Sequence, residues 1–246
     1  MKTADLIVID IETASAYPSF DEMEFIWQEL WIEKVSKTLT NGNTVSELYN
    51  SRAGVMAEFS KIVCISMGWF DQPEHQVFRI KSLFGSDEKS ILTDFLYELK
   101  KINSLNPNWI FAGHNIKEFD IPFICRRLIA NNLQLPEYLD FQKMKPWETN
   151  IIDTFQYWRF GDYKNYTSLK LLANVMKVPS SKDDIDGSMV GPLYWETNPI
   201  QHEINLLRIA QYCSKDVITT ANILLRFDNQ KIMNPEKIII EEMKST

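Results

Sequence analysis

The stretch Leu6–Phe20, LIVIDIETASAYPSF, decides the fold of this chain. Its first four residues are uniformly apolar, which is typical of a strand buried within a sheet. Asp10 and Glu12 follow while the chain is still extended, and alternate residues of a strand point to one face. Two carboxylates this close raise each other's pKa unless a cation lies between them. The stretch therefore predicts either a cation site at the end of a buried strand or two acids solvated by the next loop.

The composition indicates a chain that builds a packed core. Its 246 residues are 45% hydrophobic and 12% aromatic, which argues against disorder. No apolar window approaches the length of a membrane span, and the first apolar run ends in acids, unlike a signal peptide. Cys64, Cys125 and Cys213 are widely spaced in apolar stretches. We therefore expect reduced thiols, a cytoplasmic location and no membrane partner.

The charge is unevenly distributed. A net charge of −7 counts against general, sequence-blind binding of nucleic acid. Between Lys143 and Lys182, however, seven basic residues stand against three acidic ones, which leaves a local charge of +4. Within this stretch, Arg159–Tyr166 interleaves basic and aromatic residues. This pattern fits either an ordinary solvated face or a surface that binds a nucleic-acid strand.

Strand and helix patterns alternate along the chain and predict an α/β layer architecture. The expected strands cover 5–12, 62–70, 76–80 and 109–112, and residues 151–158 fit a strand or a short helix. The expected helices cover 20–37, 87–102, 116–130, 168–176 and 204–227, with a less regular one ending near 59. Turns are expected at 41–43, 71–73 and within 182–191. We expect one domain over 1–246, in which about 17–60 form a helical insertion between the first two strands.

Two further acidic motifs follow the first. After the strand expected at 109–112, the segment GHNIKEFD places Asp120 in the first turn of a helix, where an acid commonly complements the helix dipole. Tyr212 and Asp216 lie four residues apart on the last helix, so they share a face beside its apolar stripe. Each motif alone fits an ordinary surface acid. Together they read D-x-E, N-x-x-x-F-D and Y-x-x-x-D in that order, which favours a shared site.

In this order and context, the three motifs resemble the exonuclease motifs of the DEDD superfamily, in the branch with tyrosine in the third motif (DEDDy). The resemblance spans about Asp5–Phe227 and is particularly evident for stand-alone bacterial 3′-5′ exonucleases similar to family-B DNA polymerases, on the stretches DIETA, GHNIKEFDIPFICRR and WRFGDYKNYTSLKLLA. The sister branch carries His five positions before the last Asp, where this chain has Gln211. The resemblance implies a ribonuclease H-like mixed sheet flanked by helices.

The resemblance also implies a site with two divalent metal ions, Mg²⁺ or Mn²⁺. Asp10, Glu12 and Asp216 would hold the first ion, and Asp10 would bridge to a second that Asp120 supports. Oxygen ligands suit these ions, and no His/Cys cluster with zinc spacing stands in the sequence. Two ions about 4 Å apart clamp the attacking and leaving oxygens of an in-line displacement. Tyr212 would orient the attacking water, because a phenol with a pKa of about 10 is a poor base.

The implied reaction releases a nucleoside 5′-monophosphate from a 3′ end. Substrate contacts are expected from Thr13, Asn115, Phe119, Arg159 and Lys164. We expect a single-stranded 3′ end and favour DNA, but the choice between DNA and RNA stays open, because no residue pattern in one sequence identifies a contact to the 2′-OH. Two alternatives stay open. One is a non-catalytic module that binds nucleic acid with the same fold, and the other is a proofreading subunit that acts only beside a separate polymerase. The presence of all four carboxylates and the tyrosine favours the enzyme.

Three other residues have simpler interpretations. Trp27 and Trp31 lie at helical spacing, so we expect them in the core rather than on a stacking platform. His114 falls within the second motif but matches no ligand of the family, so we expect no metal-binding role for it.

Overall fold

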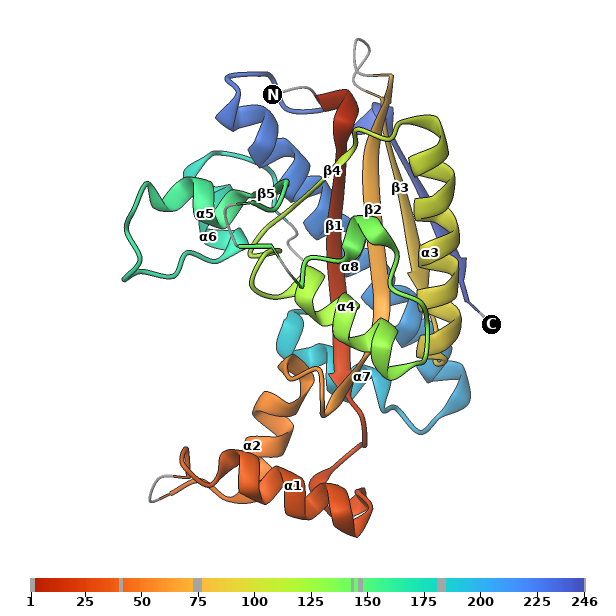
Figure 1. Ribbon diagram of the computed structural model, residues 1–246, viewed down its shortest axis with the longest axis vertical. Coiled ribbons are helices and arrows are strands. Elements are labelled where there is room, and N and C mark those ends of the chain that lie inside the picture. Colours follow the sequence, from red (N-terminus) through yellow and green to blue (C-terminus); the bar gives the residue numbers. More distant parts are fainter. Residues whose placement is uncertain are drawn as a thin grey trace.

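The structure is a computed structural model that describes residues 3–39, 42–72, 77–142, 144–145, 148–180 and 185–245. A six-stranded mixed sheet in the order β5-β4-β1-β2-β3-β6 runs through the molecule, with helices on both of its faces (Figure 1). The predicted α/β class is therefore confirmed. None of the helices in the described ranges is long and apolar enough to cross a bilayer.

The sheet combines antiparallel and parallel pairs. β1 pairs antiparallel with β2, and β2 pairs antiparallel with β3. The other pairs, β1 with β4, β4 with β5 and β3 with β6, are parallel. The strands are β1 (Leu6–Ser15), β2 (Ser60–Gln72), β3 (Val77–Phe84), β4 (Ile110–Gly113), β5 (Ile151–Asp153) and β6 (Ile238–Lys244).

Helices cover the sheet unequally. α8 runs along one face across β1, β2 and β3, while α3 and α4 cover the other face (Figure 1). The α-helices of the described part are α1 (Phe25–Val35), α2 (Val45–Arg52), α3 (Glu88–Leu105), α4 (Asp120–Ala130), α5 (Thr154–Arg159), α6 (Leu169–Val175), α7 (Val190–Tyr194) and α8 (Pro199–Phe227).

The insertion between β1 and β2 carries α1 and α2 and lies at the lower end of Figure 1. It has its own apolar cluster around Trp31, which is fully buried with its ring edge-on to Tyr49 and Phe59. Trp27 is partly buried against the same cluster. Both tryptophans therefore lie in a core, as expected.

Several boundaries differ from the sequence prediction. α1 begins at Phe25, after a short 3₁₀ turn over Phe20–Glu22, and α2 already ends at Arg52. α4 begins at Asp120 rather than at 116, because Phe119, with φ −121° and ψ −75°, lies outside the helical conformation. Residues 151–158 form both candidate elements in succession, β5 and then α5.

Two elements, α7 and β6, are absent from the predicted set. α7 has only five residues, and β6 is a short strand on the exposed edge of the sheet. A strand of this kind is specified by its pairing with β3 rather than by its own pattern. The turns predicted at 41–43, 71–73 and 182–191 include residues outside the described ranges, as do both ends of the basic stretch, Lys143 and Lys182.

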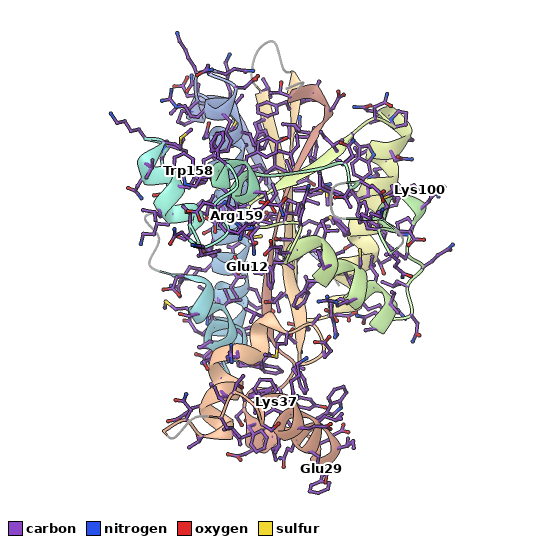
Figure 2. The ribbon with its side chains drawn as sticks, turned by 60° about the vertical axis from the view of Figure 1, so that its left-hand side comes forward. Glu12, Glu29, Lys37, Lys100, Trp158 and Arg159 are labelled. Carbon is purple, nitrogen blue, oxygen red and sulfur yellow. The ribbon has the colours of Figure 1, made fainter. Side chains whose placement is uncertain are left out.

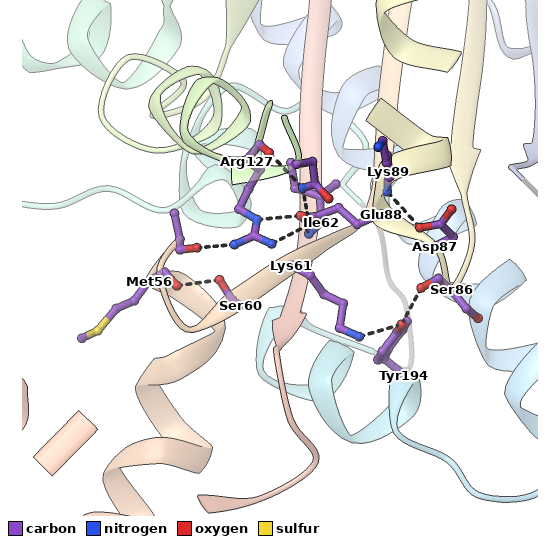
Figure 3. Close-up of polar contacts among 12 residues, drawn as sticks. Met56, Ser60, Lys61, Ile62, Ser86, Asp87, Glu88, Lys89, Arg127 and Tyr194 are labelled. Carbon is purple, nitrogen blue, oxygen red and sulfur yellow. Dashed lines mark hydrogen bonds and ion pairs between the residues drawn. The ribbon is translucent and has the colours of Figure 1, made fainter. Parts of the chain in front are cut away.

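A buried polar cluster joins α3, α4 and β2 on the side opposite α8 (Figure 3). Glu88, in the first turn of α3, accepts the Ile62 N–H at 2.7 Å and pairs with the Arg127 guanidinium at 2.6 Å. Asn131 also donates to Glu88, and Arg127 donates to the carbonyl of Ala57. The cluster thus fixes the chain where it leaves the insertion and enters β2.

Candidate active site

Alternation along β1 determines where its two acids point. Leu6 and Val8 pack against the cluster that contains α8, while Ile7 and Ile9 pack against α3 and α4 on the other face. Because side chains alternate along a strand, Asp10 continues the row formed by Leu6 and Val8, and Glu12 follows it. The register of β1 against β2 shifts only after Glu12. Both carboxylates therefore face α8.

Asp120 reaches β1 from the N-terminus of α4. Its Oδ1 accepts the N–H of Ile11 at 3.1 Å, so it sits against the backbone between Asp10 and Glu12. Asp120 is 4% exposed and Glu12 is 8% exposed. The first and second motifs are therefore in direct contact at the end of β1.

Asp153 fixes the loop that precedes Asp120. The sequence analysis does not single this residue out. It is buried at the end of β5 and accepts the N–H groups of Asn115 at 3.0 Å and Lys117 at 3.2 Å. It also caps α5 by accepting the Phe155 N–H at 2.9 Å. The Asp153-Thr154 pair after an apolar run is a helix-cap signature that could have revealed the residue.

The third motif lines a cleft of about 430 Å³ with the first. Asp10 from β1 and Tyr212 and Asp216 from α8 all border this cleft. The thiol of Cys213 lies beside them and donates to the backbone carbonyl of Asp10 at 3.3 Å. Strand alternation and helical spacing thus bring the three predicted motifs to one place.

Repulsion between the neighbouring carboxylates dominates the electrostatics of the cleft. The pKa of Asp10 is raised well above its usual value by burial and by repulsion from Glu12 and Asp216. Burial and repulsion from Asp216 also raise the pKa of Glu12 well above its usual value. Burial raises the pKa of Asp120 to about 7, although backbone hydrogen bonds oppose this shift. The pKa of the Tyr212 hydroxyl is raised by burial and then by Asp216.

The residues fit hard divalent cations. Asp10 Oδ2 is buried and has no hydrogen-bond partner in the described part of the chain. Carboxylate oxygens of Asp10 and Glu12, together with the Cys213 sulfur, lie within 4.8 Å of one another. Buried carboxylates without a counter-charge are costly, and oxygen ligands are those that Mg²⁺ and Mn²⁺ prefer.

Three predicted substrate residues are partly buried. The Thr13 hydroxyl donates to the carbonyl of Gly54 at 2.6 Å, so it ties β1 to the insertion. Asn115 Oδ1 is buried without a partner among the described residues. Phe119 precedes Asp120 directly, and its ring centroid lies 5.4 Å from that of Phe123.

Arg159 and Lys164 are placed differently from each other. The Arg159 side chain is only 16% exposed; its guanidinium carbon lies 3.8 Å from the Phe155 ring centroid, and Nη1 pairs with Glu118 at 3.3 Å. Lys164 is exposed. In Figure 2, Arg159 and Glu12 both lie in the middle of the molecule, away from the insertion that carries Glu29.

The segment after α5 presents aromatic rings to solvent. Phe160 is 90% exposed and Tyr163 is 80% exposed. Tyr166 borders the same cleft as Asp10, although the sequence analysis notes it only as part of the interleaved segment. The interleaved segment therefore extends from solvent to the acidic cleft.

His114 also borders the cleft, and both of its ring nitrogens are engaged. Nδ1 lies 2.9 Å from the Thr154 hydroxyl, and Nε2 lies 3.0 Å from the carbonyl of Thr167. Burial lowers the pKa of the ring. These contacts fix the His114 ring between Thr154 and Thr167 at the edge of the cleft.

Residues 55–244 match the family model described as a predicted 3′-5′ exonuclease related to the exonuclease domain of PolB. The chain belongs to this family. The matched range contains the second and third motifs, whereas Asp10 and Glu12 precede it. The relationship to polymerase-type exonucleases predicted from the motifs is confirmed.

A solved structure similar to this chain is the family B DNA polymerase from the hyperthermophilic archaeon Pyrobaculum calidifontis. The TM-score is 0.53 at 16% identity, over 90% of this chain and 24% of the polymerase. The chain thus spans about a quarter of the polymerase's length, and the similarity confirms the ribonuclease H-like fold. A search of curated proteins finds no match.

Proposed function

We propose that this PolB-related exonuclease removes nucleotides from the 3′ end of single-stranded DNA and releases nucleoside 5′-monophosphates. One observation carries the proposal. The carboxylates of the partly buried Asp10 and of the buried Glu12 and Asp120 converge where Asp10 Oδ2 has no partner in the described ranges. Tyr212 and Asp216 border the same cleft.

Asp10, Glu12, Asp120 and Asp216 would hold two divalent ions, Mg²⁺ or Mn²⁺, as the family uses. When bound, these ions supply Lewis acidity and neutralise charge on the scissile phosphate. The Ile11 N–H fixes one oxygen of Asp120, so this carboxylate is oriented before any ion arrives. Binding the ions would also relieve the repulsion that raises the pKa of Asp10 and Glu12.

Tyr212 would orient the attacking water by donating a hydrogen bond to it. Burial and the neighbouring carboxylate of Asp216 raise the pKa of its hydroxyl, so the phenol keeps its proton at neutral pH. A protonated phenol is a hydrogen-bond donor and not a general base. Tyr212 is therefore a positioning group in the cleft.

The nucleic-acid strand would reach the cleft along the interleaved segment, Arg159–Tyr166. Phe160 and Tyr163 offer exposed rings, and Tyr166 continues the row to the cleft that contains Asp10. Bases of an unpaired strand stack on such rings without sequence preference. Lys170, which also borders the cleft, supplies a cation for a backbone phosphate. A single strand fits this arrangement because its bases are free to stack.

Digestion of end-labelled strands by the wild-type protein tests the direction and the substrate. Single strands and duplexes of DNA and RNA carry a label at the 3′ or the 5′ end and are incubated with Mg²⁺, Mn²⁺ or EDTA. We expect mononucleotide from the 3′ label first, fastest on single-stranded DNA and absent in EDTA. Release from the 5′ end, internal cleavage or equal activity in EDTA would contradict the proposal.

A separate polymerase is the alternative context, because the similar solved domain forms 24% of a family B DNA polymerase. In that case, the protein would digest a mismatched 3′ end much faster when a polymerase is added. Rates on matched and mismatched primers, with and without a family-B polymerase from the same source, distinguish the two contexts. Equal rates with and without polymerase would favour the independent enzyme.

A further inference from the structure

We propose that Cys213 forms, with Asp10 and Glu12, a binding site for thiophilic divalent ions of the Zn²⁺ and Cd²⁺ class within the nuclease centre. Such ions would bind more tightly than Mg²⁺ and would inhibit the reaction that Mg²⁺ supports. This inference rests on the proposed function, because it assigns a sulfur ligand to the same carboxylates.

The geometry places one sulfur and two carboxylates together. A carboxylate oxygen of Asp10, one of Glu12 and the Cys213 Sγ all lie within 4.8 Å of one another. Zinc-type ions bind sulfur at about 2.3 Å and oxygen at about 2.0–2.2 Å, so small side-chain movements would bring these atoms onto one ion.

Two elements, α8 and β1, fix the position of the Cys213 thiol. Cys213 is fully buried on α8 as part of the apolar cluster between α8 and the sheet, and its thiol donates to the Asp10 carbonyl at 3.3 Å. Asp10 Oδ2 is buried without a hydrogen-bond partner in the described part of the chain, and Glu12 is 8% exposed. An ion is thus the partner that this oxygen lacks.

Ligand softness explains the selectivity. Mg²⁺ and Mn²⁺ are satisfied by carboxylate and water, whereas a thiolate favours softer ions, and nitrogen, oxygen and sulfur sites generally bind Zn²⁺ more tightly than Mn²⁺. Coordination of the sulfur releases the thiol proton to solvent. A soft ion held by Cys213 would occupy Asp10 and Glu12, which the proposed Mg²⁺ site also needs.

The other cysteines provide matched comparisons. Cys64 stands opposite Glu12 in the β1–β2 ladder, and its sulfur lies 3.8 Å from the Ser66 hydroxyl. Cys125 lies on α4, where its thiol donates to the carbonyl of Leu139 at 3.5 Å, outside the acidic cleft. Cys125→Ser therefore serves as the control that leaves the site intact.

Cadmium titration tests the inference directly. Cd²⁺ is added to metal-free wild type, Cys213→Ser, Cys64→Ser and Cys125→Ser, and the ultraviolet charge-transfer absorption of a Cd²⁺–thiolate bond is recorded. We expect this band in the wild type, Cys64→Ser and Cys125→Ser, and its loss in Cys213→Ser. A band that persists in Cys213→Ser, or that depends on Cys64 or Cys125 instead, would overturn the inference.

If Cys213→Ser does not fold, a second variant still tests the shared site. Asp10→Asn keeps the thiol but removes one ligand charge, and we expect its Cd²⁺ affinity to fall at least about tenfold. Unchanged affinity would overturn the shared site.

Nuclease assays with Mg²⁺ on the wild type and Cys125→Ser separate the two proposals. Mg²⁺-dependent digestion without a Cys213-dependent band overturns this inference alone. The band without any digestion supports the metal site and overturns the proposed function.

Discussion

Single residues at the end of β1 work against the stability of the metal-free protein. The partly buried Asp10 lies close to the buried Glu12 and Asp120, and the cost of ionising three neighbouring carboxyls there raises their pKa values. Neutralising them would stabilise the fold, but it would also remove the charge that attracts a cation. The sequence places these acids where binding, rather than packing, explains them.

The stability of the metal-free protein should depend on pH, because ionising the clustered acids destabilises the fold. The pKa of Asp120 is raised from 3.8 to about 7, so its stabilising contribution is complete below 3.8 and is lost as the pH rises through about 7. We expect the free energy of unfolding of the metal-free protein to fall over this range, by up to about 4 kcal/mol from this residue. Chemical denaturation across pH measures it. Asp120→Asn should show a weaker fall, and an identical profile would contradict the assignment.

Replacing Tyr212 by Phe should separate orientation from metal binding. The variant loses one hydrogen-bond donor in the cleft, so we expect kcat to fall by about 10²-fold while metal affinity stays unchanged. Single-turnover digestion and calorimetric titration of Mn²⁺ measure the two quantities. An unchanged rate would remove Tyr212 from the mechanism, and lost metal binding would make it a structural residue instead.

At the scale of elements, buried polar residues fix the frame around the site. Glu88 and Arg127 join α3 to α4, so Arg127→Ala leaves a buried carboxylate without its cation. We expect a loss of about 3–5 kcal/mol in the free energy of unfolding. Lys101→Ala, which removes a more exposed partner of Glu98, should lower the free energy of unfolding much less than Arg127→Ala does. Equal losses in the two variants would show that the cluster is not structural.

The loop that carries Asp120 depends on Asp153. Asp153→Ala leaves the N–H groups of Asn115, Lys117 and Phe155 without their acceptor, so we expect a loss of about 1–3 kcal/mol in stability and slower digestion. Asp153→Asn retains one acceptor oxygen and should lie between the wild type and Asp153→Ala in denaturation and rate. Wild-type values for Asp153→Ala would contradict this role.

Local periodicity predicted the elements that place the acids. Alternation along β1 puts Asp10 and Glu12 on one face, and helical spacing puts Tyr212 and Asp216 on one side of α8. These relations depend only on neighbouring residues, so the sequence contains them. The capping of α5 by Asp153 is also a local signal, but its hydrogen bonds to Asn115 and Lys117 depend on β5 pairing with β4, which no local pattern specifies.

At the scale of the whole molecule, nonlocal packing limits what a sequence predicts. β6 follows from its pairing with β3, and the burial of Arg159 follows from the approach of Glu118 and Phe155. The sequence suggests that Arg159 belongs to a basic surface that binds the strand. In the structure its side chain packs against Phe155 and pairs with Glu118, and exposed aromatic rings lie beside it. The place of Cys213 among the acids likewise depends on how α8 packs on β1.

The proposed function requires that the converging carboxylates form a metal-dependent nuclease centre. The most direct test compares mononucleotide release from a 3′-labelled single strand by wild type and Asp10→Asn, each with Mg²⁺ and with EDTA. Both proteins are first shown to be folded by circular dichroism. We predict that Asp10→Asn is at least as stable as the wild type without metal, yet slower by about 10³-fold or more with Mg²⁺. A folded Asp10→Asn protein that digests the strand at the wild-type rate would contradict the account.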